Sequence, residues 1–357
     1  MRIGIFDPYL STLSGGEKYM LSLALCLAQE NEVSVFWNEK EEAEIRKRAH
    51  SKLGLDLSPV KFYKNIFGPN VSSINRFIES KKFDAIVYLS DGSIPLVGTN
   101  LFVHFQFPVE WVNSASIKNR IKLAFVKKIF CNSSFTKSFI DRKLSVKSEI
   151  LYPPVNLGVV KDVKKENVVL HIGRFDVNSQ GINFKKQDVM IKVFKKMIDE
   201  GLKGWEFIVI IGTKIEDKNN VNKLKELANG YPIKIIENPT NQVLWENYSK
   251  AKIYWHASGY GEDLQKHPEK AEHFGISTVE AMGSGAVPVV INAGGQKEIV
   301  ENGKNGYLWD TLEDMVKKTL SLIKDDRLWQ ELSKNAIERC KIFSGDRFCN
   351  DLKGIIK

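Results

Sequence analysis

The chain has 357 residues, of which 43% are hydrophobic and 27% are charged, and its formal net charge is +9. This length predicts two domains of ordinary size, and no apolar run approaches the roughly 20 residues that a membrane-spanning helix needs. The positive charge fits a lysine-rich solvated surface or attraction to anionic lipid and phosphate-bearing substrates, whereas nucleic acid is disfavoured because the basic residues are spread along the chain without a nucleic-acid-binding motif.

The four cysteines are scattered along the sequence. They stand at Cys26, Cys131, Cys340 and Cys349, and none has a close partner in the sequence. This spacing argues against a zinc site and a disulfide framework, and it is typical of a protein of the reducing cytoplasm. We therefore expect a cytoplasmic location.

The chain opens with an apolar strand over residues 2–7. A loop containing Gly15 and Gly16 follows, and then an apolar-periodic helix over 19–29. Strand, glycine loop and helix in this order begin a dinucleotide-type α/β unit, although the absence of G-x-G-x-x-G disfavours a nicotinamide cofactor. The two glycines either let a bound diphosphate or sugar approach the backbone or form a plain helix-entry turn.

Strand and helix patterns then alternate through the first half of the chain. Further β segments are predicted at 32–37, 60–64, 83–89, 101–105 and 128–132. This alternation implies a mostly parallel sheet covered on both faces. His104 lies at the end of one of these strands, where ligand crevices form in such folds. A lone histidine is more often structural than catalytic, so both readings stay open at this point.

The segment Tyr152-Pro153-Pro154 cannot easily continue a strand or a helix. A polar and basic run over 157–167 follows it. We place the interdomain linker here, with one domain over 1–160, a second over 161–340 and a final helical segment over 341–357.

The second half restarts the alternation with a strand at 168–172. Gly173-Arg174 follows this strand, and Lys185 and Lys186 open the next helix. Two cations at the end of a strand and the start of a helix could neutralise a diphosphate, Arg as a planar fork and Lys as a point charge. The alternative is that they are ordinary surface cations.

Three histidines of this half, at 256, 267 and 273, are candidate metal ligands. Their spacing fits no metal-binding motif, and the chain contains no Asp-x-Asp that would bridge a donor through a metal. We predict no metal site.

The most informative stretch is 272–298, EHFGISTVEAMGSGAVPVVINAGGQKE. Gly275 stands just before a helical pattern, where its lack of a Cβ lets a ligand approach the backbone. The unpaired N–H groups and partial positive charge of a first helical turn form an anion site. The predicted donors are the backbone groups of Gly275, Ile276 and Ser277.

Two acids flank this helix start. Glu280 lies about one turn into the helix, where its carboxylate could accept hydrogen bonds from the hydroxyls of a ribose, and Glu272 lies in the preceding loop. The purely structural alternative is that Ser277 and Glu280 form a capping box.

The pattern Glu272, seven residues, Glu280, followed by AMGSGAVPVV and AGGQKEIV, resembles the donor-binding signature of family-four glycosyltransferases. HIGRFD followed by KKQDVMIKVF is similar to the Gly-Arg and Lys pair of the family. FDPYLSTLSGGEKYMLSLALCLA resembles its glycine loop, which faces the donor. The likeness points toward the mannosyltransferases that extend dolichol-linked oligosaccharides and their bacterial and archaeal relatives.

This resemblance implies an α/β fold of the GT-B type, with two Rossmann-like domains facing across a cleft and a C-terminal helix crossing back to the first domain. It implies a retaining, metal-independent hexosyltransferase that uses a nucleotide-diphosphate sugar. The first domain would be on the acceptor side and the second would bind the nucleotide sugar. The family pattern assigns the diphosphate to Arg174 and Lys185, with Lys185 favoured over Lys186 by spacing, the ribose to Glu280, the donor sugar to Glu272 and the reacting sugar or acceptor hydroxyls to His104.

The expected partners follow from the same resemblance. GDP-mannose is the favoured donor, and the acceptor is a glycan or a lipid-linked saccharide of cell-envelope synthesis. We expect no cofactor and no nucleic acid, and we expect attachment to the inner face of a membrane whose anionic lipid attracts the positive chain. The alternatives are an epimerase or phosphorylase with the same donor site, and a nucleotide-sugar-binding protein that has lost transfer.

Overall fold

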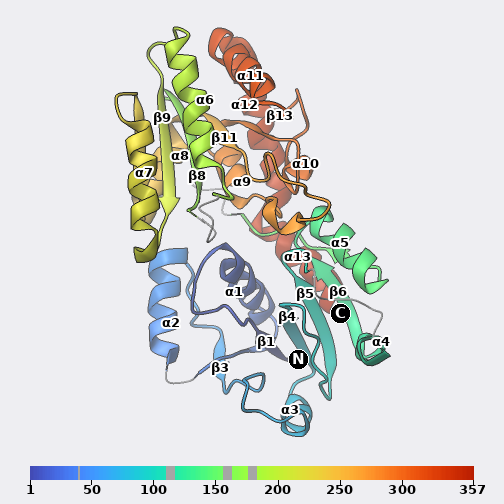
Figure 1. Ribbon diagram of the computed structural model, residues 1–357. Coiled ribbons are helices and arrows are strands. Elements are labelled where there is room, and N and C mark those ends of the chain that lie inside the picture. Colours follow the sequence, from blue (N-terminus) through green and yellow to red (C-terminus); the bar gives the residue numbers. More distant parts are fainter. Residues whose placement is uncertain (39–40, 110–116, 156–162, 176–182) are drawn as a thin grey trace. The chain divides into compact units, whose positions relative to one another are not determined.

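The computed structural model describes residues 1–38, 41–109, 117–155, 163–175 and 183–357. They form two compact units, one made of Met1–Pro154 with Gly345–Lys357 and the other of Val155–Ser344 (Figure 1). The domain boundary that the sequence predicts, between residues 160 and 161, falls outside the described residues.

The first unit is built on a seven-stranded sheet with the order β3-β2-β1-β4-β5-β6-β7. Every pair of neighbouring strands in it is parallel. The strands are β1 (Arg2–Phe6), β2 (Glu32–Phe36), β3 (Lys61–Tyr63), β4 (Ala85–Leu89), β5 (Asn100–Phe105), β6 (Val126–Cys131) and β7 (Glu149–Ile150). The helices are α1 (Gly15–Ala28), α2 (Glu42–Arg48), the π-helix η2 (Ala49–Leu53), α3 (Ser73–Ser80), α4 (Ile117–Ala124), α5 (Ser134–Leu144) and α13 (Gly345–Ile356).

Helices cover both faces of this sheet because successive strand residues point to opposite sides. Val87 of β4 belongs to one apolar cluster, together with side chains of α1, α2 and α13. Its neighbour Ile86 belongs to the other, together with side chains of α5. All five residues of β4 are buried, which explains why this strand is a continuous apolar run in the sequence.

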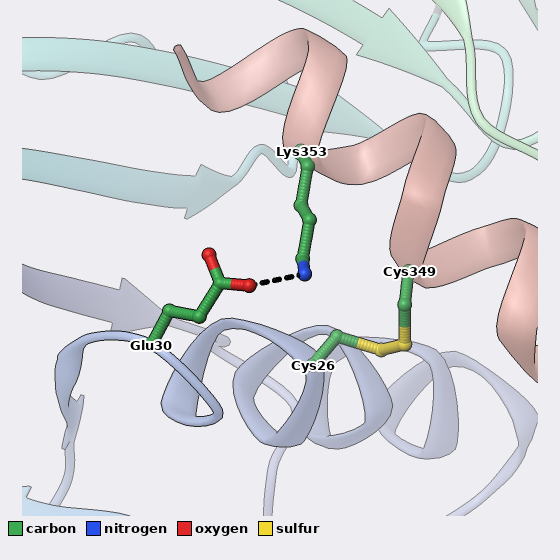
Figure 2. Close-up of a disulfide and its surroundings, with 4 residues drawn as sticks. All are labelled: Cys26, Glu30, Cys349 and Lys353. Carbon is green, nitrogen blue, oxygen red and sulfur yellow. Dashed lines mark hydrogen bonds and ion pairs between the residues drawn. A yellow bond between two sulfur atoms is a disulfide. The ribbon is translucent and has the colours of Figure 1, made fainter.

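The C-terminal helix α13 belongs to the first unit and packs on α1. The ring of Phe348 meets that of Tyr19 edge to face at 5.2 Å. A disulfide joins Cys26 of α1 to Cys349 of α13. Four residues further along each segment, Lys353 of α13 forms an ion pair with Glu30, which lies just beyond the end of α1 (Figure 2). The expectation of no disulfide is therefore wrong, because the two cysteines are 323 residues apart in sequence but 5.3 Å apart between Cα atoms.

The second unit is built on a six-stranded sheet with the order β10-β9-β8-β11-β12-β13, which is also parallel. The strands are β8 (Glu166–Arg174), β9 (Glu206–Gly212), β10 (Ile233–Glu237), β11 (Ala251–His256), β12 (Val287–Ile291) and β13 (Tyr307–Trp309). The helices are α6 (Gln187–Asp199), α7 (Lys218–Ala228), α8 (Asn241–Lys250), α9 (Ile276–Gly283), α10 (Gln296–Ile299), α11 (Leu312–Lys324) and α12 (Asp326–Cys340). Short 3-10 turns complete it at η3 (Ile215–Asp217), η4 (Pro268–Lys270) and η5 (Lys341–Phe343). Two parallel-sheet, Rossmann-like units confirm the predicted fold class.

Strand order in the second sheet fixes where a ligand can bind. The chain builds outward from β8 through β9 to β10 and then returns to place β11 on the other side of β8. The crevice at the carboxyl ends of two such strands is the usual ligand site of open α/β sheets. Arg174 ends β8 and His256 ends β11, so both residues lie at this point of the sheet.

A partly buried lysine connects the opposite ends of these elements. Lys165 donates to the carbonyl oxygens of Ala251 at 3.0 Å and of Ser284, which caps the C-terminal end of α9. It also reaches Tyr248 O, in the last turn of α8, at 3.4 Å. The last carbonyls of a helix have no partner inside it, so one ammonium group satisfies carbonyls from three elements. Burial lowers the pKa of Lys165 to about 8.

Asp7 follows β1 and is only 1% exposed. Its Oδ1 accepts a hydrogen bond from Tyr9 N at 2.8 Å, while Oδ2 has no hydrogen-bond partner among the described residues. Burial, and after it the charge of the nearby buried Glu17, raises the pKa of Asp7 to about 8. Asp7 is therefore mainly protonated at neutral pH.

No helix of the described residues has both the length and the apolar character that crossing a bilayer would take.

The raised pKa of Asp7 predicts a pH-dependent stability. Between its ordinary value of 3.8 and about 8, the folded chain holds a proton that the unfolded chain has lost. Stability should therefore fall with rising pH, by at most about 1.4 kcal/mol per pH unit. Asp7→Asn should remove this part of the slope in urea unfolding at several pH values, whereas Asp346→Asn, at an exposed position of the same unit, should keep it. An unchanged slope in Asp7→Asn would contradict the assignment.

The disulfide predicts a redox-dependent stability. Cys349→Ser should lower the free energy of unfolding by about 2–4 kcal/mol, because the open chain gains conformational freedom when it unfolds. Thermal unfolding should show the same loss when the wild-type chain is reduced, and reductant should not affect the variant further. If the melting temperature of the wild-type chain is the same with and without reductant, the disulfide does not contribute to stability.

Candidate functional site

One carboxylate oxygen connects three segments at the carboxyl edge of the second sheet. Glu272 Oε2 accepts from Lys185 Nζ at 2.8 Å and from His256 Nε2 at 2.8 Å. Lys185 lies just before α6, His256 ends β11, and Glu272 lies in the loop before α9. A cation, an acid and an imidazole therefore meet beside the end of β8.

The surroundings keep this acid charged. Burial by itself would raise the pKa of Glu272, but the Lys185 ammonium and the hydrogen bond from His256 outweigh it and hold the pKa well below its ordinary value. Burial lowers the pKa of His256, against the pull of Glu272. A neutral His256 that donates through Nε2 leaves Nδ1 to accept from Ser258 N at 3.4 Å, which is the tautomer that the hydrogen bonds favour.

A glycine pair positions the loop that carries Glu272. Gly295 N donates to Glu272 O at 2.7 Å. Gly294 has a φ of +59°, and a Cβ there would lie 2.2 Å from the same carbonyl oxygen. At Gly295 a Cβ would lie 2.4 Å from Phe274 Cα. Only glycines let the two backbones approach this closely, so the pair has a structural role in placing the acid.

Helix α9 begins where the sequence predicts an anion site. Gly275 is the N-cap with φ +119°, and the first intrahelical hydrogen bonds run from Thr278 N and Val279 N to Gly275 O, at 3.0 and 3.2 Å. The N–H groups of Gly275, Ile276 and Ser277 precede these bonds, as expected for the first turn of a helix.

The capping-box alternative for Glu280 is wrong. It needs Ser277 as the N-cap, but Ser277 lies inside the helix, and its hydroxyl accepts from Tyr254 OH at 2.7 Å. Glu280 Oε2 instead accepts from Tyr248 OH at 2.8 Å. Two buried tyrosines therefore orient the polar side chains of this helix.

Arg174 and the two lysines differ in their contacts. Arg174 is exposed, and among the described residues its guanidinium has no hydrogen-bond or ion-pair partner. Lys185 is paired with Glu272, whereas Lys186 Nζ forms an ion pair at 2.7 Å with Glu262. The structure thus brings Lys185, not Lys186, to Glu272.

His104 departs from the prediction. It is fully buried in the first unit, with its ring stacked between those of Tyr19 at 4.4 Å and Phe130 at 4.5 Å. Its Nδ1 is 3.1 Å from Phe130 O, and burial lowers its pKa to about 3. A contact with sugar hydroxyls is not supported, because the side chain points from β5 into the core instead of out of the strand end.

The predicted glycines of the first unit open α1. Gly16 O accepts from Gln106 Nε2 at 3.0 Å, and a Cβ on Gly16 would lie 2.4 Å from Gln106 Oε1. The end of the Gln106 side chain thus occupies the space beside Gly16, and a contact of Gly15 or Gly16 with a donor stays a prediction. His104 and the glycines belong to the first unit, and the other predicted site residues belong to the second.

Sequence reasoning missed three side chains that shape the site: His256, Tyr248 and Tyr254. The strand-end rule that singled out His104 applies equally to His256, which ends β11, but we considered His256 only as a metal ligand. Among the described residues, no three His, Cys, Asp or Glu side chains gather in a way that could hold a metal ion.

Comparison with known sequences identifies relatives of both units. A family model described as "Glycosyl transferases group 1" matches residues 159–339. A GDP-Man:Man(3)GlcNAc(2)-PP-Dol alpha-1,2-mannosyltransferase of Xenopus tropicalis is 28% identical over 76% of this chain and 54% of its own length. The corresponding Dictyostelium discoideum protein is matched over 48% of its length, so the chain spans about half of these relatives. The alpha-1,3/1,6-mannosyltransferase ALG2 of Dictyostelium discoideum is 23% identical, and the match spans all of this chain and 98% of that protein.

Solved structures share the architecture. Anabaena Alr3699/HepE in complex with UDP has a TM-score of 0.75 at 16% identity, and the match covers all of this chain and 99% of that one. A glycosyltransferase from Rickettsia africae ESF-5 has a TM-score of 0.73 at 15% identity, over 100% and 98% of the two chains. These neighbours are GT-B glycosyltransferases, and at such identities the likeness shows the fold.

Because the Glu272 carbonyl lies so close to Gly294, adding one methyl group at this position should lower stability strongly. Gly294→Ala should displace the Glu272 carbonyl and cost about 1–3 kcal/mol of overpacking beyond the backbone strain of a positive φ. Gly230→Ala is the matched control, because Gly230 has a φ of +79° but a Cβ there would meet nothing within 4 Å. Thermal unfolding of the two variants measures the difference. Equal losses would mean that the glycine pair does not hold the loop.

Proposed function

The chain belongs to the glycosyl transferases of group 1, and we propose that it transfers a hexose from a nucleotide-diphosphate sugar to a glycan or lipid-linked acceptor. The family match spans every candidate residue of the second unit, from Arg174 to Glu280. The observation that carries the proposal is the meeting of Lys185, His256 and Glu272 at the carboxyl edge of β8 and β11, beside the start of α9.

The diphosphate would bind at the cationic part of this site. Arg174 is exposed and its guanidinium is unpaired among the described residues, so its planar fork is available for phosphate oxygens. The ammonium group of Lys185 has three N–H donors. One of them donates to Glu272, which leaves the others for phosphate oxygens. The first turn of α9 adds backbone N–H groups and the positive end of a helix dipole.

Transfer requires the nucleotide diphosphate to leave the anomeric carbon, and negative charge develops on the departing oxygen. Preorganised donors aimed at that charge usually give the largest catalytic contribution. Arg174, Lys185 and the α9 start would supply them. Glu272, held anionic by Lys185 and His256, would orient the donor sugar and stabilise positive charge near its ring. Glu280, held by Tyr248, would accept the ribose hydroxyls.

We also propose the identity of the donor, the stereochemistry of transfer and the cellular location of the enzyme. GDP-mannose is favoured because relatives named as mannosyltransferases, including two proteins named for GDP-Man, align with this chain. We further propose transfer with retention of the anomeric configuration and without a metal ion, in cell-envelope glycan synthesis. The Cys26–Cys349 disulfide removes the cysteine argument for a cytoplasmic location. We propose that location on charge alone: the enzyme would work in the cytoplasm, at the inner face of a membrane, where anionic lipid attracts its net charge of +9.

Calorimetric titration with a panel of nucleotide sugars tests the donor site. One donor, GDP-mannose in this proposal, should bind at micromolar levels. Glu280→Ala and Arg174→Ala should each weaken it at least tenfold, which is about 1.4 kcal/mol. Arg327→Ala, at an exposed arginine of the same unit, is the matched control and should bind normally. If no donor binds, or if both site variants bind like wild type, the assignment is wrong.

A further inference from the structure

Helix α3 turns its apolar side chains to solvent. Ile74, Phe77 and Ile78 are 72%, 42% and 56% exposed. Their spacing places them on one face of the helix. A surface helix of a globular unit normally buries such a face against the core, so α3 is oriented the opposite way.

Polar contacts on the inner side hold α3 in this orientation. Arg76 donates to Ile66 O at 3.3 Å, and its guanidinium lies 5.7 Å from the centre of the Phe67 ring. Glu79 accepts from Lys82 at 2.9 Å and from Tyr63 OH at 3.0 Å, and these bonds lower its pKa to about 2. The outward apolar face is therefore built into the packing of the helix.

Helix α4 repeats the arrangement. Ile117, Ile121 and Phe125, each four residues apart, are 75%, 53% and 65% exposed, whereas Leu123 is partly buried against the core. The two helices and Phe125 together carry six of the eleven large hydrophobic side chains that are exposed among the described residues. Exposed apolar side chains that gather in this way mark an interaction site.

The two helices lie over the same face and edge of the first sheet. Phe67, beneath Arg76 of α3, and Leu123 of α4 pack against the same apolar cluster. α3 leads into β4 and Phe125 directly precedes β6, and these two strands flank β5 (Figure 1). Leu96, 39% exposed, lies on the loop into β5, and Gly98 N of that loop donates to Ser80 Oγ at the end of α3 at 2.7 Å. The exposed apolar side chains thus lie on segments that lead into three neighbouring strands of one sheet.

Basic residues lie close to these apolar faces, most of them around α4. Six Lys or Arg and no acidic residue stand between Glu110 and Asp141 in the sequence. Arg120 and Lys127 are exposed, and Lys81, at the end of α3, lies 5.1 Å from the centre of the Phe77 ring. Around α4, apolar residues therefore stand beside Lys and Arg in an acid-free stretch of sequence, a composition that binds the interface of an anionic bilayer.

We propose that the outward faces of α3 and α4 insert into the interface of a membrane rich in anionic phospholipid. The apolar side chains would enter the headgroup region, while Lys81, Arg120 and Lys127 would pair with lipid phosphates. This inference rests on the proposed attachment to a membrane surface and names the elements that make it. All of them lie in the first unit, whereas the candidate donor site lies in the second.

Sedimentation with lipid vesicles tests the surface directly. The full chain should partition at least tenfold more strongly into vesicles of phosphatidylcholine with phosphatidylglycerol than into phosphatidylcholine alone, and added salt should weaken the binding. The triple variant Ile117→Ser, Ile121→Ser, Phe125→Ser should lose at least tenfold in partitioning. Ile215→Ser is the matched control, because Ile215 is 95% exposed in the second unit, and it should bind like wild type.

Three results would overturn the inference. They are equal binding to neutral and anionic vesicles, wild-type binding by the triple variant, and a change from dimer to monomer in size-exclusion chromatography of that variant, which would mark a contact between copies. Unfolding curves of all variants check that each is folded. Donor titration of the same preparations separates the two proposals, because loss of vesicle binding with intact donor binding rejects only the surface, and the converse rejects only the transferase site.

Discussion

The second unit depends at its carboxyl edge on one shared carboxylate. Glu272 Oε2 is bound by Lys185 and by His256, and each of these three residues comes from a different segment of the chain. Removing one partner of a partly buried ion pair leaves the other charge without compensation, which costs more than a surface pair contributes. The positions of α6, β11 and the α9 loop relative to one another are therefore coupled through this acid, and a ligand that engages Lys185 acts on all three.

The glycine pair and Lys165 fix the positions of the segments that Glu272 connects. Gly294 and Gly295 bring a backbone against the Glu272 loop that no side chain would allow, while Lys165 fixes the far ends of α8 and α9 through their terminal carbonyls. At the carboxyl edge of the second sheet, Glu272 is thus held in a fixed position, whereas Arg174 is exposed to solvent. Such an arrangement suits a site that must hold fixed charges against a departing anion, because the donors need no reorganisation when the charge develops.

The sequence predicted the parts of this arrangement that depend on local order. Strand ends, helix starts and the spacing of Glu272 and Glu280 indicated one sheet edge, and both parallel sheets followed from the alternation of strand and helix patterns. Contacts between distant segments could not be predicted in this way. Whether His104 turned into the core or outward depended on which neighbours packed beside β5, and the partner of Cys26 depended on where the last helix returned. The outward face of α3 depended equally on tertiary contacts, because helical spacing places Ile74, Phe77 and Ile78 on one face without fixing whether that face meets the core or solvent.

The bond between Cys26 and Cys349 closes nearly the whole chain into a covalent ring. The second unit lies entirely inside that ring as an insertion in the first, and its own ends meet where Val155 N donates to Phe343 O at 2.9 Å. A protease that nicks any loop between the two cysteines would therefore leave one connected molecule and not two fragments. In the reduced chain, only non-covalent packing and strand pairing would hold the two pieces of a nicked backbone together.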